Sequence, residues 1–403
     1  MTYGTGLTPP SHPRFPTPFA QPEHGVGAHI APAPAVPPLP VASRRGRRAW
    51  GWLWPVLALM LLALVAYFVT FLGAAASIVG MLAALIPYAI VIGAVVLIDR
   101  WEPEPKGLLA FAVAWGAIAS VAFTLLFDLA LRVAAPFLRE ADFFGAVVQA
   151  PIVEEVFKGL GLLLIFWMGR RAFDGPVDGV VYGAMVGAGF AFTENIQYFA
   201  IAVIEGGAAQ LGFTFVLRGI LSPFCHAMFT GLTGFALGLA ARRGLATGPS
   251  LAYWLVGLVG AVLLHALWNG AGYVVSGGIV GWLGYYVVLQ VPIFALFVFG
   301  VVLLRREEAR LTRERLGEYA TAGWFTPQEV DMLATPVGRR TGMAWAATLR
   351  GDRRKLMKSF IRDSASLAAA RQRALSGRDP HAAEDEHVLL ARIAATRQAL
   401  LSY

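Results

Sequence analysis

Residues 50–98 read WGWLWPVLALMLLALVAYFVTFLGAAASIVGMLAALIPYAIVIGAVVLI, and this stretch decides the fold of the chain. It contains no Asp, Glu, Lys or Arg. A helix needs about 20 apolar residues to cross the hydrocarbon core of a bilayer, so the stretch is long enough to cross twice. We therefore predict two membrane spans here, at residues 50–72 and 76–98.

The rest of the chain continues this pattern as far as residue 304. Six further apolar stretches of similar length lie at residues 108–135, 143–169, 177–204, 211–241, 251–275 and 281–304. Of the 403 residues, 57% are hydrophobic and only 14% are charged, which is too little charge for a soluble protein of this size. The sequence predicts an all-α fold, a polytopic membrane helix bundle of about eight transmembrane helices within a lipid bilayer.

Polar regions on both sides of the bundle give the predicted domain boundaries. Residues 1–49 hold 11 of the 24 prolines and no apolar run, which is typical of a disordered extension. The bundle then occupies residues 50–304. Residues 305–403 carry apolar residues at helical spacing and predict a small cytosolic helical tail. Within the tail, TPQE at 326–329 predicts a helix start with a capping box and a first-turn proline.

The basic residues indicate the direction in which the spans run. They gather in every second loop, as Arg100 with Lys106, Arg170 with Arg171, Arg242 with Arg243, and Arg305 with Arg306. Positive charge marks cytosolic loops, so we expect a multi-pass plasma-membrane protein with both termini in the cytoplasm. The exceptions are Arg132, Arg139 and Arg218, near outer ends of spans. The net charge of +8 is explained mainly by this pattern, and we expect no nucleic-acid partner.

Ionisable residues inside the spans require a separate explanation. Each costs about 2.5 to 3.5 kcal/mol on insertion scales, so each needs a partner or a function. Four successive spans carry such residues, with neighbouring amides, in PIVEEVFKG, FAFTENIQY, SPFCHAMFTG and HALWNG: Glu154, Glu155, Lys158, Glu194, Asn195, His226, His265 and Asn269. Asp128 in the third span lies one turn before Arg132 and is predicted to form an i,i+4 ion pair instead.

Three of these residues are predicted to share one layer of the membrane. Glu154 and His226 each lie 16 residues before the arginine pair that ends their span, and His265 lies 15 residues after Ser250. At 1.5 Å per residue all three are then ~23 Å from the inner surface. This places them in the outer half of the membrane, where they can form one site.

The motifs EEVFK, FAFTEN, FCHAMFTG and HALWNG resemble, in this order, those of the PrsW family of intramembrane proteases. The resemblance covers roughly residues 80–330 and includes DRWEPEP at 99–105 and GWFTPQE at 323–329. The family is similar to the CAAX-protease and bacteriocin-processing superfamily. That superfamily's pattern of paired glutamates, a histidine and a HxxxN helix is matched here by Glu154, Glu155, His226, His265 and Asn269. It usually has arginine after the glutamates, where this chain has Lys158.

The resemblance implies an intramembrane endopeptidase that hydrolyses a membrane-anchored regulatory protein, for example an anti-sigma factor, near the extracytoplasmic face. Peptide hydrolysis needs an activated water, a stabilised oxyanion and a proton for the leaving amine. The expected catalytic residues are Glu154, Glu155, His226, His265 and Asn269. The expected supporting residues are Lys158, Glu194 and Asn195.

Two versions of this chemistry remain open at the level of sequence. In one, Glu155, His226 and His265 bind a divalent metal, for which zinc is the expectation, and the other glutamate is the base. In the other, no metal binds, a glutamate and a histidine activate the water, and Asn269 supports the oxyanion. The sequence does not say which of the adjacent glutamates is the base. Because they point about 100° apart on a helix, one is expected to be structural, for example Glu154 paired with a lysine four residues on.

Each polar residue also has a structural interpretation. His226 alone would fit a hydrogen-bonded core histidine, and His265 and Asn269 share a helix face that would suit interhelical hydrogen bonds. Glu194 and Asn195 lie nearer the outside and either bind substrate or lock the bundle.

Two further groups of residues have structural roles in this interpretation. Glycines of the fifth and sixth spans predict close helix packing: Gly183, Gly187, Gly189, Gly231, Gly234 and Gly238. The acidic residues Asp99, Glu102 and Glu104 predict a solvated cytosolic loop.

A proton- or ion-coupled transporter is the alternative function, because buried Glu, Lys and His residues also mark ion pathways. Transporters often carry internal repeats and helices broken near the midplane. No repeat is evident in this sequence, and the polar residues gather in one layer. Neither the substrate's identity nor the oligomeric state follows from the sequence.

The arginine pattern generates a test of the orientation. Tags fused at residue 1 and at residue 403 should both resist protease added outside intact cells, because an even number of spans returns the chain to the cytoplasm. Digestion of either tag from outside would contradict the eight-span arrangement.

Overall fold

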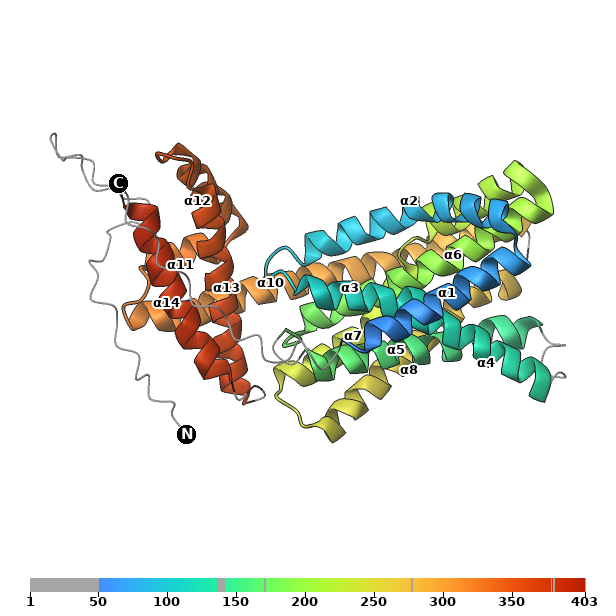
Figure 1. Ribbon diagram of the computed structural model, residues 1–403, viewed down its shortest axis with the longest axis horizontal. Helices are drawn as coiled ribbons and strands as arrows, with labels where there is room; N and C mark the ends of the chain where they lie inside the picture. Colours follow the sequence, from blue (N-terminus) through green and yellow to red (C-terminus); the bar gives the residue numbers. More distant parts are fainter. Residues whose placement is uncertain are drawn as a thin grey trace. The chain divides into compact units, whose positions relative to one another are not determined.

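The computed structural model describes residues 51–135, 142–169, 172–276, 278–377, 379 and 381–402. The predicted N-terminal extension, residues 1–49, lies outside the described residues. Within the described ranges every regular element is a helix, and no strand is present (Figure 1). The predicted all-α membrane bundle is confirmed.

Among the described residues, the helices that begin before Arg305 can be grouped into eight consecutive segments, each running back against the one before it. They are α1 (Leu53–Phe71); α2 (Ala74–Ile98); α3 (Lys106–Ala114) with η1 (Trp115–Ser120) and α4 (Val121–Ala134); η3 (Phe144–Gln149) with α5 (Ala150–Met168); the first part of α6 (Pro176–Phe215); its second part with η4 (Val216–Leu221) and α7 (Cys225–Arg242); α8 (Thr247–Val274); and α9 (Gly278–Tyr285) with η5 (Tyr286–Gln290) and α10 (Val291–Thr321).

Fewer of these segments are recognised as membrane spans by their length and apolar composition alone. Six stretches of the described chain are long and apolar enough to cross a membrane. One of them, Pro176–Arg242, holds two passes, and α5 is not among the six because it carries three charged residues. The helix that fails the composition test is therefore the one that carries the paired glutamates.

Helix α6 is two helices joined by a reversal at Gly206 and Gly207. Gly207 has φ +61°, a conformation that favours glycine. The ring of Phe215, after the reversal, packs 5.7 Å from the ring of Phe199, before it, so the chain turns back on itself. The returning pass is interrupted between η4 and α7 at residues 222–224, which include a proline.

Glycines bring α6 and α7 into backbone contact. A Cβ atom on Gly179 would lie 2.0 Å from the carbonyl oxygen of Gly234, and one on Gly183 would lie 2.6 Å from that of Thr230. A Cβ atom on Gly187 would lie 2.3 Å from the carbonyl oxygen of His226. The close packing predicted from the glycines is present, and it holds the first turn of α7 directly against α6.

The acidic loop before α3 was predicted to be solvated, and this prediction is wrong for two of its residues. Asp99 and Glu104 are buried. The backbone N–H of Glu104 donates to the Asp99 carboxylate at 3.1 Å, and the Tyr182 hydroxyl of α6 donates to the Glu104 carboxylate. Burial raises the pKa of Glu104 well above its ordinary value, and the nearby Asp178 raises it further. The loop therefore holds α6 in place, a role that its polar composition did not reveal.

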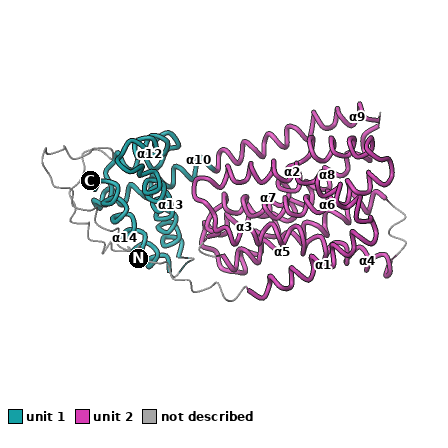
Figure 2. Tube along the Cα trace, turned by 45° about the horizontal axis from the view of Figure 1, so that its top comes forward, with its two compact units in different colours: residues 1–44, 305–403 teal, residues 45–304 magenta. Residues whose placement is uncertain are grey.

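The described residues divide into two compact units, with the boundary between Leu304 and Arg305 inside α10 (Figure 2). The unit that follows Leu304, unit 1 in Figure 2, contains α11 (Pro327–Leu333), α12 (Pro336–Thr348), α13 (Arg354–Ser376) and α14 (Ala382–Leu401), packed around an apolar core of its own. The predicted capping box is confirmed: Glu329 N–H donates to Thr326 Oγ1 at 3.1 Å, and Thr326 N–H donates to the Glu329 carboxylate at 2.8 Å.

The glycine contacts generate a prediction about stability. Gly179→Ala should lower the melting temperature of the detergent-solubilised protein, because the added methyl group meets backbone atoms that cannot move aside, and overpacking costs typically about 1 to 3 kcal/mol. Gly93→Ala, in α2, is the matched control, since a Cβ atom there has no neighbour within 4 Å. Equal melting temperatures for the two variants would contradict the predicted role of the α6–α7 contact.

Candidate functional site

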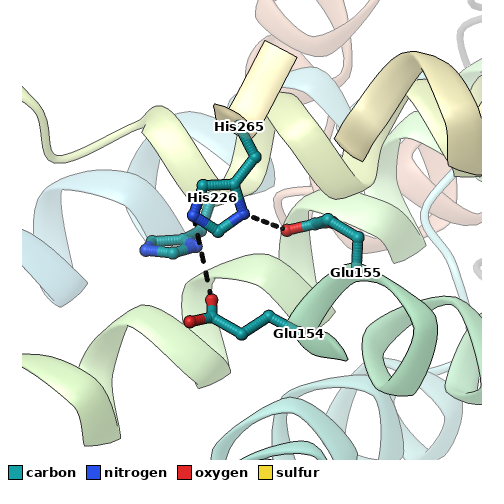
Figure 3. Close-up of side chains that lie close together, drawn as sticks. All are labelled: Glu154, Glu155, His226 and His265. Atoms are coloured by element: carbon teal, nitrogen blue, oxygen red, sulfur yellow. Dashed lines mark hydrogen bonds and ion pairs between the residues drawn. The ribbon is translucent and has the colours of Figure 1, made fainter. Parts of the chain in front are cut away.

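Four side chains from three helices meet inside the bundle. Glu154 and Glu155 come from α5, His226 from the first turn of α7, and His265 from α8. One ligand atom from each lies within 4.8 Å of the others, and all four residues are buried (Figure 3). We call these residues the carboxylate–histidine group.

The two glutamates differ in how far their oxygens are engaged. Glu155 is fully buried: Oε1 accepts from Lys158 Nζ at 2.8 Å and lies 3.1 Å from His265 Nδ1, and Oε2 accepts from Thr230 Oγ1 at 3.0 Å. Glu154 Oε2 accepts from Lys158 at 3.1 Å, whereas Glu154 Oε1 has no hydrogen bond to any of the described residues. Both carboxylate oxygens of Glu155 are therefore engaged by partners, whereas Glu154 keeps one free carboxylate oxygen.

Lys158 lies one turn after the glutamates on α5 and is completely buried. Besides both glutamates, its ammonium contacts His226 Nδ1 at 2.9 Å and lies 3.7 Å from the centre of the Phe190 ring. The Glu154–Lys158 ion pair considered from the sequence is present, at 3.1 Å. It is one contact of a larger network.

The partners of the histidines determine which ring nitrogen carries hydrogen. An ammonium only donates, so His226 Nδ1 accepts from Lys158, and the neutral ring then donates from Nε2 to the Glu194 carboxylate, 3.0 Å away. A carboxylate only accepts, so His265 Nδ1 donates to Glu155 and its neutral ring keeps a lone pair on Nε2. That nitrogen lies 3.9 Å from Glu154 Oε2. Figure 3 shows the His265 ring between the two carboxylates.

Arg218 of η4 extends this network. Its guanidinium donates to Glu194 and, at 2.7 Å from Nε, to Asn195 Oδ1, and it lies 3.9 Å from the centre of the Tyr198 ring. Glu194 thus connects Arg218 to His226, and the bond from Arg218 to Asn195 ties η4 to the first part of α6. From the sequence, Arg218 was expected only as a basic residue near the outer end of a span.

Two signals in the sequence could have identified the partners that were missed. Arg218 and Glu194 lie at nearly equal distances along the chain from the Gly206–Gly207 pair, so a hairpin centred there brings them together. Thr230 lies four residues after His226, on the same face of α7.

Asn269 does not make a described hydrogen bond to the carboxylate–histidine group. Its Nδ2 donates to the carbonyl oxygen of Ala146 in η3 at 3.0 Å, an interhelical hydrogen bond that ties α8 to η3. The predicted ion pair between Asp128 and Arg132 is confirmed, at 2.6 Å.

A cavity of about 280 Å³ lies between α4 and the η3–α5 pass. Its lining is Thr124, Leu125, Asp128, Asp142, Gly145, Gln149, Ala150 and Val153. Val153 directly precedes Glu154, and Ala150 lies four residues before it on the same helix face. The helix face that lines the cavity therefore leads to the glutamate with the free oxygen.

The carboxylate–histidine group is compatible with a metal ion in donor type and proximity. Carboxylate oxygens and imidazole nitrogens are common zinc ligands, and the four ligand atoms are close enough to converge on one ion. Lys158 already contacts three of the four residues.

Comparison with known proteins gives a family match in the same region. The family model described as PrsW family intramembrane metalloprotease matches residues 104–297. The protein named Protease PrsW from Geobacillus kaustophilus (strain HTA426) is 30% identical over 142 residues, 35% of this chain and 58% of the relative. The Bacillus subtilis (strain 168) protein of the same name is 33% identical over 128 residues, 32% of this chain and 54% of the relative.

The matches cover about half the length of these curated relatives. No solved structure matches the chain. The segment matched by the family model holds the whole carboxylate–histidine group. The resemblance predicted from the motifs is therefore confirmed, and the chain is similar to the PrsW family of intramembrane metalloproteases over residues 104–297.

Proposed function

We propose that this protein is an intramembrane endopeptidase whose catalytic pair is Glu154 and His265. One observation carries the proposal: Glu154 Oε1 and His265 Nε2 are left available, while the surrounding charged groups are engaged with one another. The family description and the relatives named Protease PrsW support peptide hydrolysis as the reaction.

In the proposed reaction, a water molecule binds between the Glu154 carboxylate and His265 Nε2. The two groups are 3.9 Å apart at their nearest atoms, so one water can hydrogen-bond to both. As the water oxygen bonds to the peptide carbon, Glu154 accepts the water's proton, and it later returns a proton to the leaving amine when the carbon–nitrogen bond breaks. Glu155 holds the His265 ring in the tautomer and orientation that this requires.

A divalent metal, with zinc as the candidate, would be held by Glu155, His226 and His265, with Glu154 left as the base. When bound, it would supply a water of lowered pKa and a positive charge for the oxyanion. The direct contribution of this chain is the same in both versions, since the glutamates and histidines must be fixed in one orientation. Asn269 then acts by fixing α8 against η3.

The proposed substrate is a membrane-anchored regulatory protein, such as a single-span anti-sigma factor. The cavity between α4 and α5 supports a lateral entry for the substrate chain, because its lining reaches the residue before Glu154 and includes the polar side chains of Thr124, Asp142 and Gln149. Such groups can hydrogen-bond to an unwound peptide backbone, which lipid cannot. We propose that the cytoplasm lies at the side of the Arg242–Arg243 loop, so cleavage occurs near the extracytoplasmic face.

A proton- or ion-coupled transporter is the second candidate. The interruption of the sixth pass at residues 222–224, beside His226, favours it, because transporters use broken helices at ion sites. Against it, both carboxylates next to the interruption are occupied by cationic side chains, Glu194 by Arg218 and Glu155 by Lys158. Ion uptake by the purified protein in vesicles, without peptide cleavage, would favour the transporter.

The different surroundings of the two glutamates generate a test of the catalytic assignment. Glu154→Gln should lower peptide cleavage by roughly 10²-fold or more, as expected for loss of a general base, while leaving the melting temperature near that of the wild type. Glu155→Gln should lower the melting temperature as well, because Glu155 has three buried partners. Glu205→Gln, at an exposed position on α6, is the matched control. Wild-type cleavage by the Glu154→Gln protein would refute the assignment.

The depth of the site predicts where the substrate is cut. The predicted layer is ~23 Å from the inner surface, in a hydrocarbon core about 30 Å thick. The scissile bond should therefore lie near the extracytoplasmic end of the substrate helix, as identified by mass spectrometry of both fragments. A cut in the cytosolic half would show that the orientation or the depth is wrong.

A further inference from the structure

The Lys158 ammonium lies where a cation shared by the carboxylate–histidine group would lie. Its nitrogen is 3.1 Å from Glu154 Oε2, 2.8 Å from Glu155 Oε1 and 2.9 Å from His226 Nδ1. An ammonium has three N–H donors, and these three acceptors match that number. The side chain is completely buried.

The charges around the ammonium explain why a cation is needed. Three carboxylates, those of Glu154, Glu155 and Glu194, lie in one connected network, and its other cationic side chain is Arg218. Leaving one partner of a buried ion pair alone is strongly destabilising. Without the ammonium, the two glutamates of α5 would lose their cationic partner, and only the more distant Arg218 would remain.

The same contacts oppose a second cation at this position. Zinc binds carboxylate and imidazole ligands at about 2.0 to 2.2 Å, so an ion held by this group would lie among the atoms that the ammonium already contacts. The His226 Nδ1 lone pair is used by Lys158, and His226 Nε2 faces Glu194. His226 can ligate a metal through Nδ1 only after the ammonium has moved away.

We propose that Lys158 and a divalent metal ion are alternative occupants of the carboxylate–histidine group. Lys158 acts as a positioning residue that holds the two glutamates and His226 together when no metal is bound. A metal has to displace the ammonium from those contacts, and this competition keeps metal affinity low. The inference goes beyond the proposed function, because it concerns the cation in the site and holds whether or not the protein cleaves peptides.

The experiment compares metal binding by full-length wild-type protein and Lys158→Met in detergent, with Co²⁺ as the probe. Methionine keeps an unbranched side chain of similar length and removes the competing charge together with its three N–H donors. We expect Lys158→Met to bind one Co²⁺ at least about tenfold more tightly, a difference of 1.4 kcal/mol. Visible absorption of the bound ion reports binding, and zinc should displace it. Added metal should also raise the melting temperature of Lys158→Met more than that of the wild type.

Lys106→Met is the matched control, since it removes the same charge at the first residue of α3 and should leave Co²⁺ affinity unchanged. Lys158→Gln, whose neutral amide can still donate to a carboxylate, carries the same expectation if Lys158→Met does not fold. The proposal is overturned if neither Lys158 variant binds Co²⁺ more tightly than the wild type, or if Lys106→Met gains as much. Tighter binding without peptide cleavage by the wild type would leave this inference standing and refute the proposed function.

Discussion

The absence of water in the hydrocarbon core is the constraint on which the rest of this structure depends. A buried charge there must find its partners within the protein. Here the ammonium of Lys158 meets both glutamates of α5 and a histidine of α7, and one of these glutamates meets a histidine of α8. These polar contacts tie α5, α7 and α8 together. The same contacts that satisfy the buried charges also orient the side chains available for chemistry.

Much of the bundle could be predicted from the sequence because lipid imposes simple rules. A run of about 20 apolar residues has few alternatives to a membrane helix. The cost of a polar group in lipid likewise pointed to the spans that contain Glu154, His226 and His265 before any contact was known. The structure brings these three residues together.

What could not be predicted depends on which atoms meet, and spacing along one helix does not determine this. The sequence did not distinguish the roles of Glu154 and Glu155. Their surroundings differ because Thr230 and His265, which come from other helices, contact Glu155. Arg218 enters the network only because the chain reverses within α6. The buried loop before α3 was missed for the same reason, since its main partner is a tyrosine of a later helix.

The glycine contact between α6 and α7 has a consequence for mutational surveys of this protein. Gly187 has no functional group, yet its missing side chain leaves room for the backbone of His226. A larger residue there would shift a histidine of the site without changing any catalytic atom. In a genetic screen for inactive variants, substitutions of Gly187 would be recovered together with substitutions of the glutamates. A measurement of whether each variant still folds would then distinguish a structural defect from the loss of a catalytic group.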